Sequence, residues 1–111
     1  MERRIARNEA AFRKANEDIS TTAEALGVDM PVPLICECAD PSCKEIIKLR
    51  LEDYAEVRAH PRRFLNAPGH HVAAHGVADV VAEREGYVIV EKKGYAGEVA
   101  ERLDERGGPD R

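Results

Sequence analysis

Residues 36–43 read Cys-Glu-Cys-Ala-Asp-Pro-Ser-Cys and contain all three cysteines of the chain. Three thiols cannot all pair in intramolecular disulfides, so such a cluster in a reducing compartment indicates metal binding or redox chemistry. Zinc in structural sites takes four Cys or His ligands in a tetrahedron. We therefore predict that Cys36, Cys38 and Cys43 supply three ligands of a zinc site. A redox disulfide and three unliganded thiols are the alternatives.

The fourth zinc ligand is predicted to be a histidine. His70 follows Pro68 and Gly69, and this pair sets the path by which the backbone brings His70 to the site. His71 and His75 lie close by in the sequence and remain alternatives for this position. Three cysteines and one histidine would close the coordination shell and leave no position for water, so the zinc is predicted to be structural.

The first two cysteines are predicted to lie on a strand at residues 34–38. Side chains alternate along a strand, so Cys36 and Cys38 face one side and Glu37 faces the other. A turn at residues 39–42, with Asp and Pro in favoured turn positions, returns the third cysteine toward the first two.

No catalytic group is evident beside this site. Glu37 is expected to point away from the thiols, and Asp40 is expected to hold the turn. Catalytic zinc sites need a general base near the metal. The sequence shows no nucleophile–base pair, no Gly-rich phosphate loop and no paired carboxylates with an evident pocket. The chain is therefore predicted to be non-enzymatic.

Residues 1–27 are predicted to form an N-terminal amphipathic helix that ends at Gly27. Its large apolar residues recur at intervals of seven, which keeps them near one helix face. This face either packs on the chain's own domain or pairs with a second copy or a partner protein. The candidate interaction face consists of Ile5, Phe12, Ile19 and Leu26.

The remaining chain divides into a linker, a compact domain and a tail. Residues 28–33 contain two prolines and are predicted to be an extended linker. Residues 34–93 form the predicted zinc-bound α+β domain. Residues 94–111 are a predicted tail, partly disordered, with a short helix at residues 97–103.

Short elements are predicted to follow the cysteines within this domain. They are strands at 45–50 and 63–66, a helix at 51–59, and a hairpin of 77–84 with 87–92. In the strand at 45–50, Ile47 and Leu49 are expected to face inward. Four residues of the helix at 51–59 are predicted to lie on the same helix face: Leu51, Tyr54, Ala55 and Arg58.

Composition limits the classes of protein that the chain can represent. Its 111 residues suffice for one small domain. Only 5% of them are aromatic, so the core is expected to bury little apolar area, and a bound metal would help to stabilise it. The net charge of −4 argues against a dedicated nucleic-acid binder. With no long apolar run and no signal peptide at the N-terminus, a cytoplasmic location is expected.

Several short motifs occur together in a characteristic order. They are Arg7-Asn-Glu-Ala10, Cys36 to Cys43, Tyr54 to Arg58, Arg63-Phe64, Pro68-Gly-His70, and Gly86-Tyr87 to Glu91-Lys92. In this order the chain resembles a family of small uncharacterised actinobacterial proteins. The resemblance covers nearly the whole chain and implies the same architecture, but no established activity. One departure is Arg50, where the family has a threonine before the short helix.

These observations predict an α+β fold with a small antiparallel sheet of four or five strands, a short crossing helix, a structural zinc site, and an N-terminal helix that protrudes or packs. We expect a regulatory protein that acts through protein–protein contacts. The alternative is a zinc-ribbon-like nucleic-acid-binding module, with Arg58, Arg62, Arg63 and Phe64 as contacts. A metal-dependent or thiol redox enzyme is the third hypothesis.

Overall fold

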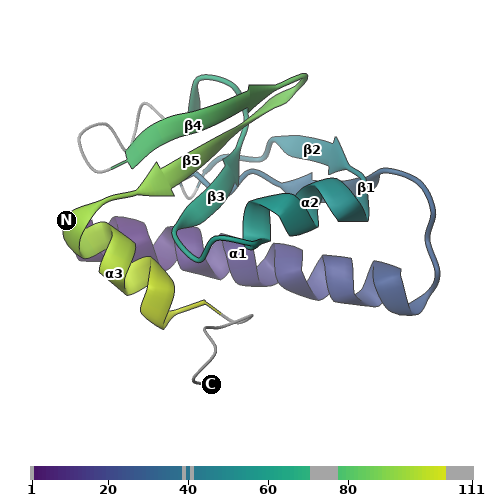
Figure 1. The fold of residues 1–111 in the computed structure, drawn as a ribbon, viewed down its shortest axis with the longest axis horizontal. Coiled ribbons are helices and arrows are strands. Elements are labelled where there is room, and N and C mark those ends of the chain that lie inside the picture. The colour runs from purple at the N-terminus through teal and green to yellow at the C-terminus, as the bar shows by residue number, and fades with distance from the viewer. Residues whose placement is uncertain (1, 39, 41, 71–77, 105–111) are drawn as a thin grey trace.

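The computed structural model describes residues 2–38, 40, 42–70 and 78–104, with side chains described from residue 10 onward. Within these residues the chain has an α+β fold of three helices and two small antiparallel sheets, as predicted (Figure 1). The elements are α1 (Glu2–Ala25), β1 (Val32–Ile35), β2 (Ile46–Leu49), α2 (Leu51–Arg58), β3 (Arg63–Asn66), β4 (Ala78–Arg84), β5 (Tyr87–Lys92) and α3 (Gly94–Arg102).

The strands of the described residues divide between two sheets instead of forming one. β1 pairs with β2, and the second sheet has the order β3-β5-β4. The sheets separate at the cysteine segment, because successive main-chain hydrogen bonds there go to different partners. The Cys36 N–H donates to Glu45 O at 3.1 Å, beside β2, whereas the Glu37 N–H donates to Leu65 O of β3 at 2.7 Å. The segment that carries the first two cysteines therefore joins the two sheets.

Strand pairing in the first sheet follows the predicted alternation. Val32 lies opposite Leu49, and Ile35 lies opposite Ile46. This register turns Leu49 and Ile47 into the core, as predicted, while Ile46 is exposed. The period of two in the sequence was sufficient to place these side chains.

The second sheet contains the predicted hairpin of β4 and β5. Gly86 in its turn has a φ of +88°, which glycine adopts without a steric penalty. The central strand β5 is buried on both faces. On one face Ile89 packs with Leu65 in the larger core cluster, which includes residues of α1, α2 and the first sheet. On the other face lies a smaller cluster of Phe64, Val88, Val90 and Ala100 of α3.

The helix α1 packs along the domain, and α3 lies against its N-terminal half (Figure 1). The buried face of α1 is mostly polar. The exposed fractions are 2% for Arg13, 0% for Asn16, 6% for Ser20 and 6% for Ala23. These residues are three or four positions apart, so they share one face of the helix.

The predicted interaction face lies beside this buried face. Phe12 and Ile19 are half-buried, Leu26 is 75% exposed, and the side chain of Ile5 lies outside the described residues. The seven-residue spacing therefore did not identify the side of α1 that docks on the domain. Arg13 and Asn16 are buried there because their hydrogen bonds offset the loss of water.

The short helix α2 buries Tyr54, Val57 and Arg58. The predicted face contained Tyr54 and Arg58 but also Leu51, which is half-buried, and Ala55, which is exposed. The prediction was wrong at Ala55 and omitted Val57. Both Val57 and Arg58 follow Tyr54 at helical spacing, and the packing against β3 selects this side of the helix.

Regular structure extends into the predicted linker and tail. β1 begins at Val32, within the predicted linker 28–33, and ends at Ile35. The prediction of a strand over residues 34–38 was therefore wrong for Cys36 and Cys38, which follow β1, because the main-chain bonds of this segment go to two different partners. α3 occupies the start of the predicted tail, and Asp104 beyond it is buried. Residues 105–111 lie outside the described residues. Among the described residues, no helix combines the length and the apolar character needed to cross a membrane.

Candidate metal centre

The structure brings together the four residues that were predicted to bind zinc. The ligand atoms of Cys36, Cys38, Cys43 and His70 all lie within 4.8 Å of one another, and the cysteines form no disulfide. His70 Nδ1 is 3.4 Å from Cys36 Sγ and 3.3 Å from Cys43 Sγ. Such a cluster can hold a metal ion. The alternatives for the fourth ligand, His71 and His75, lie outside the described residues.

Two of these ligands are buried and two are accessible. Cys36 and Cys38 have exposed fractions of 3% and 2%, and both come from the segment that joins the two sheets. Cys43 and His70 are half-buried and come from the turn before β2 and the loop after β3. The site therefore has a buried inner pair and a half-buried outer pair.

A local turn places Cys43. The Asp40 carboxylate accepts hydrogen bonds from the Ser42 N–H at 2.9 Å and from the Ser42 hydroxyl at 2.7 Å. The Cys43 N–H then donates to Asp40 O at 3.1 Å. Asp40 thus holds the turn, as predicted, through the side-chain-to-backbone bond that is typical of Asp in turns.

The His70 loop is tied to the same site by its backbone. Gly69 has a φ of +88°, and the His70 N–H donates to Ala67 O at 3.1 Å. The Ala67 N–H in turn lies 3.2 Å from Cys36 Sγ, to which it donates a hydrogen bond. The loop therefore supports a sulfur ligand as well as the histidine, and this bond stabilises a negatively charged sulfur.

Burial shifts the acidity of the inner cysteines. Loss of water raises the pKa of the Cys36 thiol, and the hydrogen bond from Ala67 only partly opposes it. Burial also raises the pKa of Cys38. Thiols ligate metals as thiolates, so a bound cation would have to offset this effect. Three sulfurs and one imidazole nitrogen suit a divalent transition-metal ion, whose positive charge would stabilise the buried thiolates.

Glu37 lies behind the metal centre and is completely buried. Its side chain points away from the thiols, as predicted, and accepts three hydrogen bonds. The donors are Asn16 Nδ2 at 2.8 Å, Tyr54 Oη at 2.7 Å and the Leu65 N–H at 2.8 Å. Burial raises the pKa of Glu37, and these hydrogen bonds oppose that effect. The sequence did not indicate these partners, because they are dispersed along the chain.

Asn16 also connects α1 to Ile35, the last residue of β1. Its side-chain amide donates to Ile35 O at 2.7 Å, and its oxygen accepts from the Ile35 N–H at 2.8 Å. One helix side chain thus satisfies both main-chain groups of Ile35, as a neighbouring strand would. Sequence analysis missed Asn16, since an asparagine inside a helix carries no signal for such a contact.

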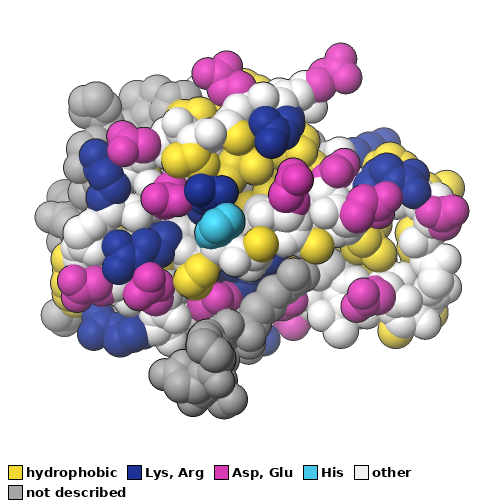
Figure 2. All heavy atoms as spheres, viewed as in Figure 1, with side chains coloured by type: hydrophobic (Ala, Val, Ile, Leu, Met, Phe, Trp, Pro, Cys, Tyr) yellow, Lys and Arg dark blue, Asp and Glu magenta, His cyan; other side chains and the backbone are white. Residues whose placement is uncertain are grey.

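The basic residues considered for nucleic-acid contact are engaged in ion pairs. Arg58 pairs with Glu17 and Asp104, Arg62 with Glu101, and Arg63 with Glu91. Phe64 is 1% exposed. Acidic and basic side chains are interspersed over the face seen in Figure 2. These residues form no continuous basic surface with an exposed aromatic ring.

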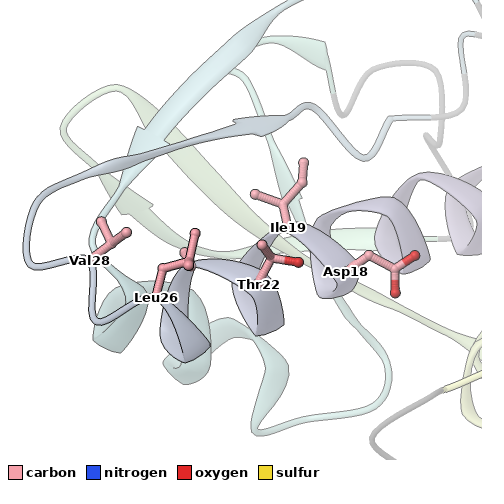
Figure 3. A pocket seen from close by; sticks show the side chains of 6 residues that line it. Asp18, Ile19, Thr22, Leu26 and Val28 are labelled. Atoms are coloured by element: carbon pink, nitrogen blue, oxygen red, sulfur yellow. The ribbon is translucent and has the colours of Figure 1, made fainter.

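An apolar groove of about 410 Å³ lies beside the C-terminal half of α1. Ile19, Leu26 and Val28 project to the same side of the helix, toward the chain that leads into β1 (Figure 3). Asp18 and Thr22 complete its rim, and Ala23 also lines it. Two residues of the predicted interaction face, Ile19 and Leu26, therefore share this groove.

Comparison of the chain with protein-family models, with curated proteins and with solved structures finds no match. The resemblance to the actinobacterial family stays a prediction.

Proposed function

We propose that Cys36, Cys38, Cys43 and His70 form a structural zinc site and that the protein is non-enzymatic and acts through protein–protein contacts. The observation that carries the first part is the convergence of four sulfur and nitrogen donors within 4.8 Å. This donor set matches the tetrahedral structural sites that zinc prefers. Zinc bound there would join the cysteine segment to the loop after β3 and so add stability to a small core.

The surroundings of the cluster support a structural role for the metal. Four protein ligands complete a tetrahedral shell, whereas catalytic zinc sites keep one position for water or substrate. The two carboxylates of the cysteine stretch are already engaged. The Glu37 carboxylate accepts from Asn16, Tyr54 and Leu65, and the Asp40 carboxylate accepts from Ser42.

The contact surface that we propose is the groove beside α1. Leu26, 75% exposed, is a projecting apolar side chain at the edge of an apolar recess. A two-fold symmetric contact places the same patch of both copies together, so the Leu26 of each copy could enter the recess of the other. The partner that we propose is therefore a second copy of this chain.

The experiment combines metal analysis with measurement of solution mass. Purified wild type should contain about one zinc ion per chain by elemental analysis. Light scattering should show a concentration-dependent dimer. Leu26→Asp should shift the protein to monomer while the zinc content and thermal stability stay at the wild-type level. Glu24→Gln, an exposed change two residues earlier, in the last turn of α1, is the matched control and should leave the dimer intact.

Two results would contradict the proposal. Purified protein without zinc, which also takes up none when zinc is added, would overturn the metal assignment. A wild type that stays monomeric over the whole concentration range would overturn self-association through the groove.

A further inference from the structure

Three hydrogen bonds from one side chain attach α1 to the metal-binding segment. Asn16 bonds both main-chain groups of Ile35 and the carboxylate of Glu37, at distances of 2.7 to 2.8 Å. Ile35 and Glu37 are the two sequence neighbours of Cys36. The backbone before this cysteine and the side chain of the residue after it are therefore both held by a helix that contributes no metal ligand.

Glu37 extends this connection to the rest of the fold. Its Oε2 atom accepts from both Asn16 and Tyr54, and its Oε1 atom accepts from the Leu65 N–H. The three donors belong to α1, α2 and β3. Because Glu37 lies between Cys36 and Cys38, the direction of both sulfur atoms depends on how this carboxylate is held.

We propose that Asn16 is a positioning residue for the metal centre, and that metal binding and the docking of α1 are coupled through Glu37. This inference rests on the zinc site proposed above. The fixed pair Cys36 and Cys38 would present two sulfurs in the ligating arrangement only when α1 is docked. Partners that orient metal ligands typically change metal affinity by about 10-fold to 100-fold when they are removed.

Coupling between two equilibria is reciprocal. If docked α1 raises the affinity for zinc, bound zinc must stabilise the docking of α1 by the same factor. Hydrogen exchange of the backbone amides of α1 measures this second quantity. In wild type we expect zinc to slow this exchange by about 10-fold or more. In the Asn16→Ala variant this difference should shrink or disappear.

The test uses the full-length protein with Zn²⁺ and, separately, with Co²⁺ as a spectroscopic probe of ligand geometry. Asn16→Ala should lower the affinity for Zn²⁺ by about 10-fold in chelator competition. At saturating Co²⁺ it should also shift or weaken the visible absorption bands. A variant that is merely less stable would retain the wild-type spectrum once every molecule is loaded.

Two control variants separate positioning from general destabilisation. Ser20→Ala changes a buried polar residue on the same face of α1, one turn further on, whose hydroxyl donates to Glu17 O within the helix. Val90→Ala removes core volume in the smaller cluster, away from the cysteine segment. Both should retain the wild-type Co²⁺ spectrum. Tyr54→Phe, which removes another donor to Glu37, should change the spectrum in the same direction as Asn16→Ala.

The outcomes distinguish this inference from the proposed function. A wild type that binds neither Zn²⁺ nor Co²⁺ overturns the zinc site and the coupling together. A wild type that binds both, with an Asn16→Ala variant that matches it in affinity, spectrum and zinc-dependent exchange, overturns the coupling alone. A Ser20→Ala variant that changes the spectrum as much as Asn16→Ala would also overturn it.

Discussion

Arg58 of α2 and Asp104, two residues beyond the end of α3, form an ion pair in the interior of the protein. The exposed fractions of the two side chains are 1% and 2%. Arg58 also reaches Glu17 of α1 at 3.2 Å, so this guanidinium joins α2 to α1 and to the segment that follows α3. The pair explains why the chain beyond α3 is held against the domain.

Loss of Asp104 should destabilise the fold strongly. Asp104→Ala removes one partner of a buried pair and leaves the charge of Arg58 with reduced compensation, which costs about 3 kcal/mol. We expect this decrease in the free energy of unfolding in urea denaturation of the metal-loaded protein. The matched control is Glu101→Ala, which removes an exposed pair with Arg62 and should cost less than about 1 kcal/mol. Equal effects of the two changes would contradict the assigned role of the buried pair.

Arg13 should not tolerate replacement by lysine. Its two terminal nitrogens donate to Pro61 O and Ala100 O, both at 2.7 Å, and its guanidinium lies 4.3 Å from the centre of the Phe64 ring. A lysine ammonium cannot reproduce this planar fork. Arg13→Lys should therefore lower the free energy of unfolding by about 2 kcal/mol.

Lys14→Arg is the corresponding control for Arg13. It exchanges the same two residue types at the next position, where the side chain is 54% exposed. Its effect on chemical denaturation should stay within about 0.5 kcal/mol. An Arg13→Lys variant as stable as this control would mean that the two hydrogen bonds and the ring contact contribute little.

Removal of the metal should lower the melting temperature. The proposed zinc joins Cys36 and His70, which are 34 positions apart in the chain, in a protein with few aromatic residues in its core. Thermal melting in a reducing buffer, with and without a strong chelator, measures the effect. Melting at the same temperature after elemental analysis has shown loss of the metal would contradict a structural role.

Zinc affinity should increase with pH. Burial raises the pKa of Cys36 and Cys38, so without metal both thiols hold their protons near neutral pH. Binding must release these protons, and acidification therefore favours the metal-free form. From about pH 6 to about pH 8, the logarithm of the binding constant should rise by about two or more per pH unit.

Chelator competition at several pH values checks this dependence on pH. His60→Ala is the control, because His60 is an exposed histidine outside the cluster and its replacement should not alter the slope. An affinity for zinc that is constant over this range would contradict ligation by the buried thiols.

The local features of this protein were predictable from the sequence. The spacing of Cys36, Cys38 and Cys43 and the Pro-Gly before His70 identified a set of ligands that the fold brings together. Alternation separated Glu37, which bonds to Asn16, from the neighbouring cysteines, and turn chemistry assigned Asp40 its role. The predictions for Glu37 and Asp40 depend on residues within a few positions of one another, where backbone geometry alone decides which way a side chain points.

Only the tertiary structure decided how α1 is attached to the metal-binding segment. Sequence periodicity selected the apolar side chains of α1, yet the docked face carries Arg13, Asn16 and Ser20. A buried polar side chain needs hydrogen-bond partners. Here the partners of Arg13 and Asn16 come from segments that are distant in the sequence, so no local sequence pattern predicts their burial. Asn16 and Glu37 are 21 positions apart, and their hydrogen bond exists only because the folded chain brings α1 beside the cysteine segment.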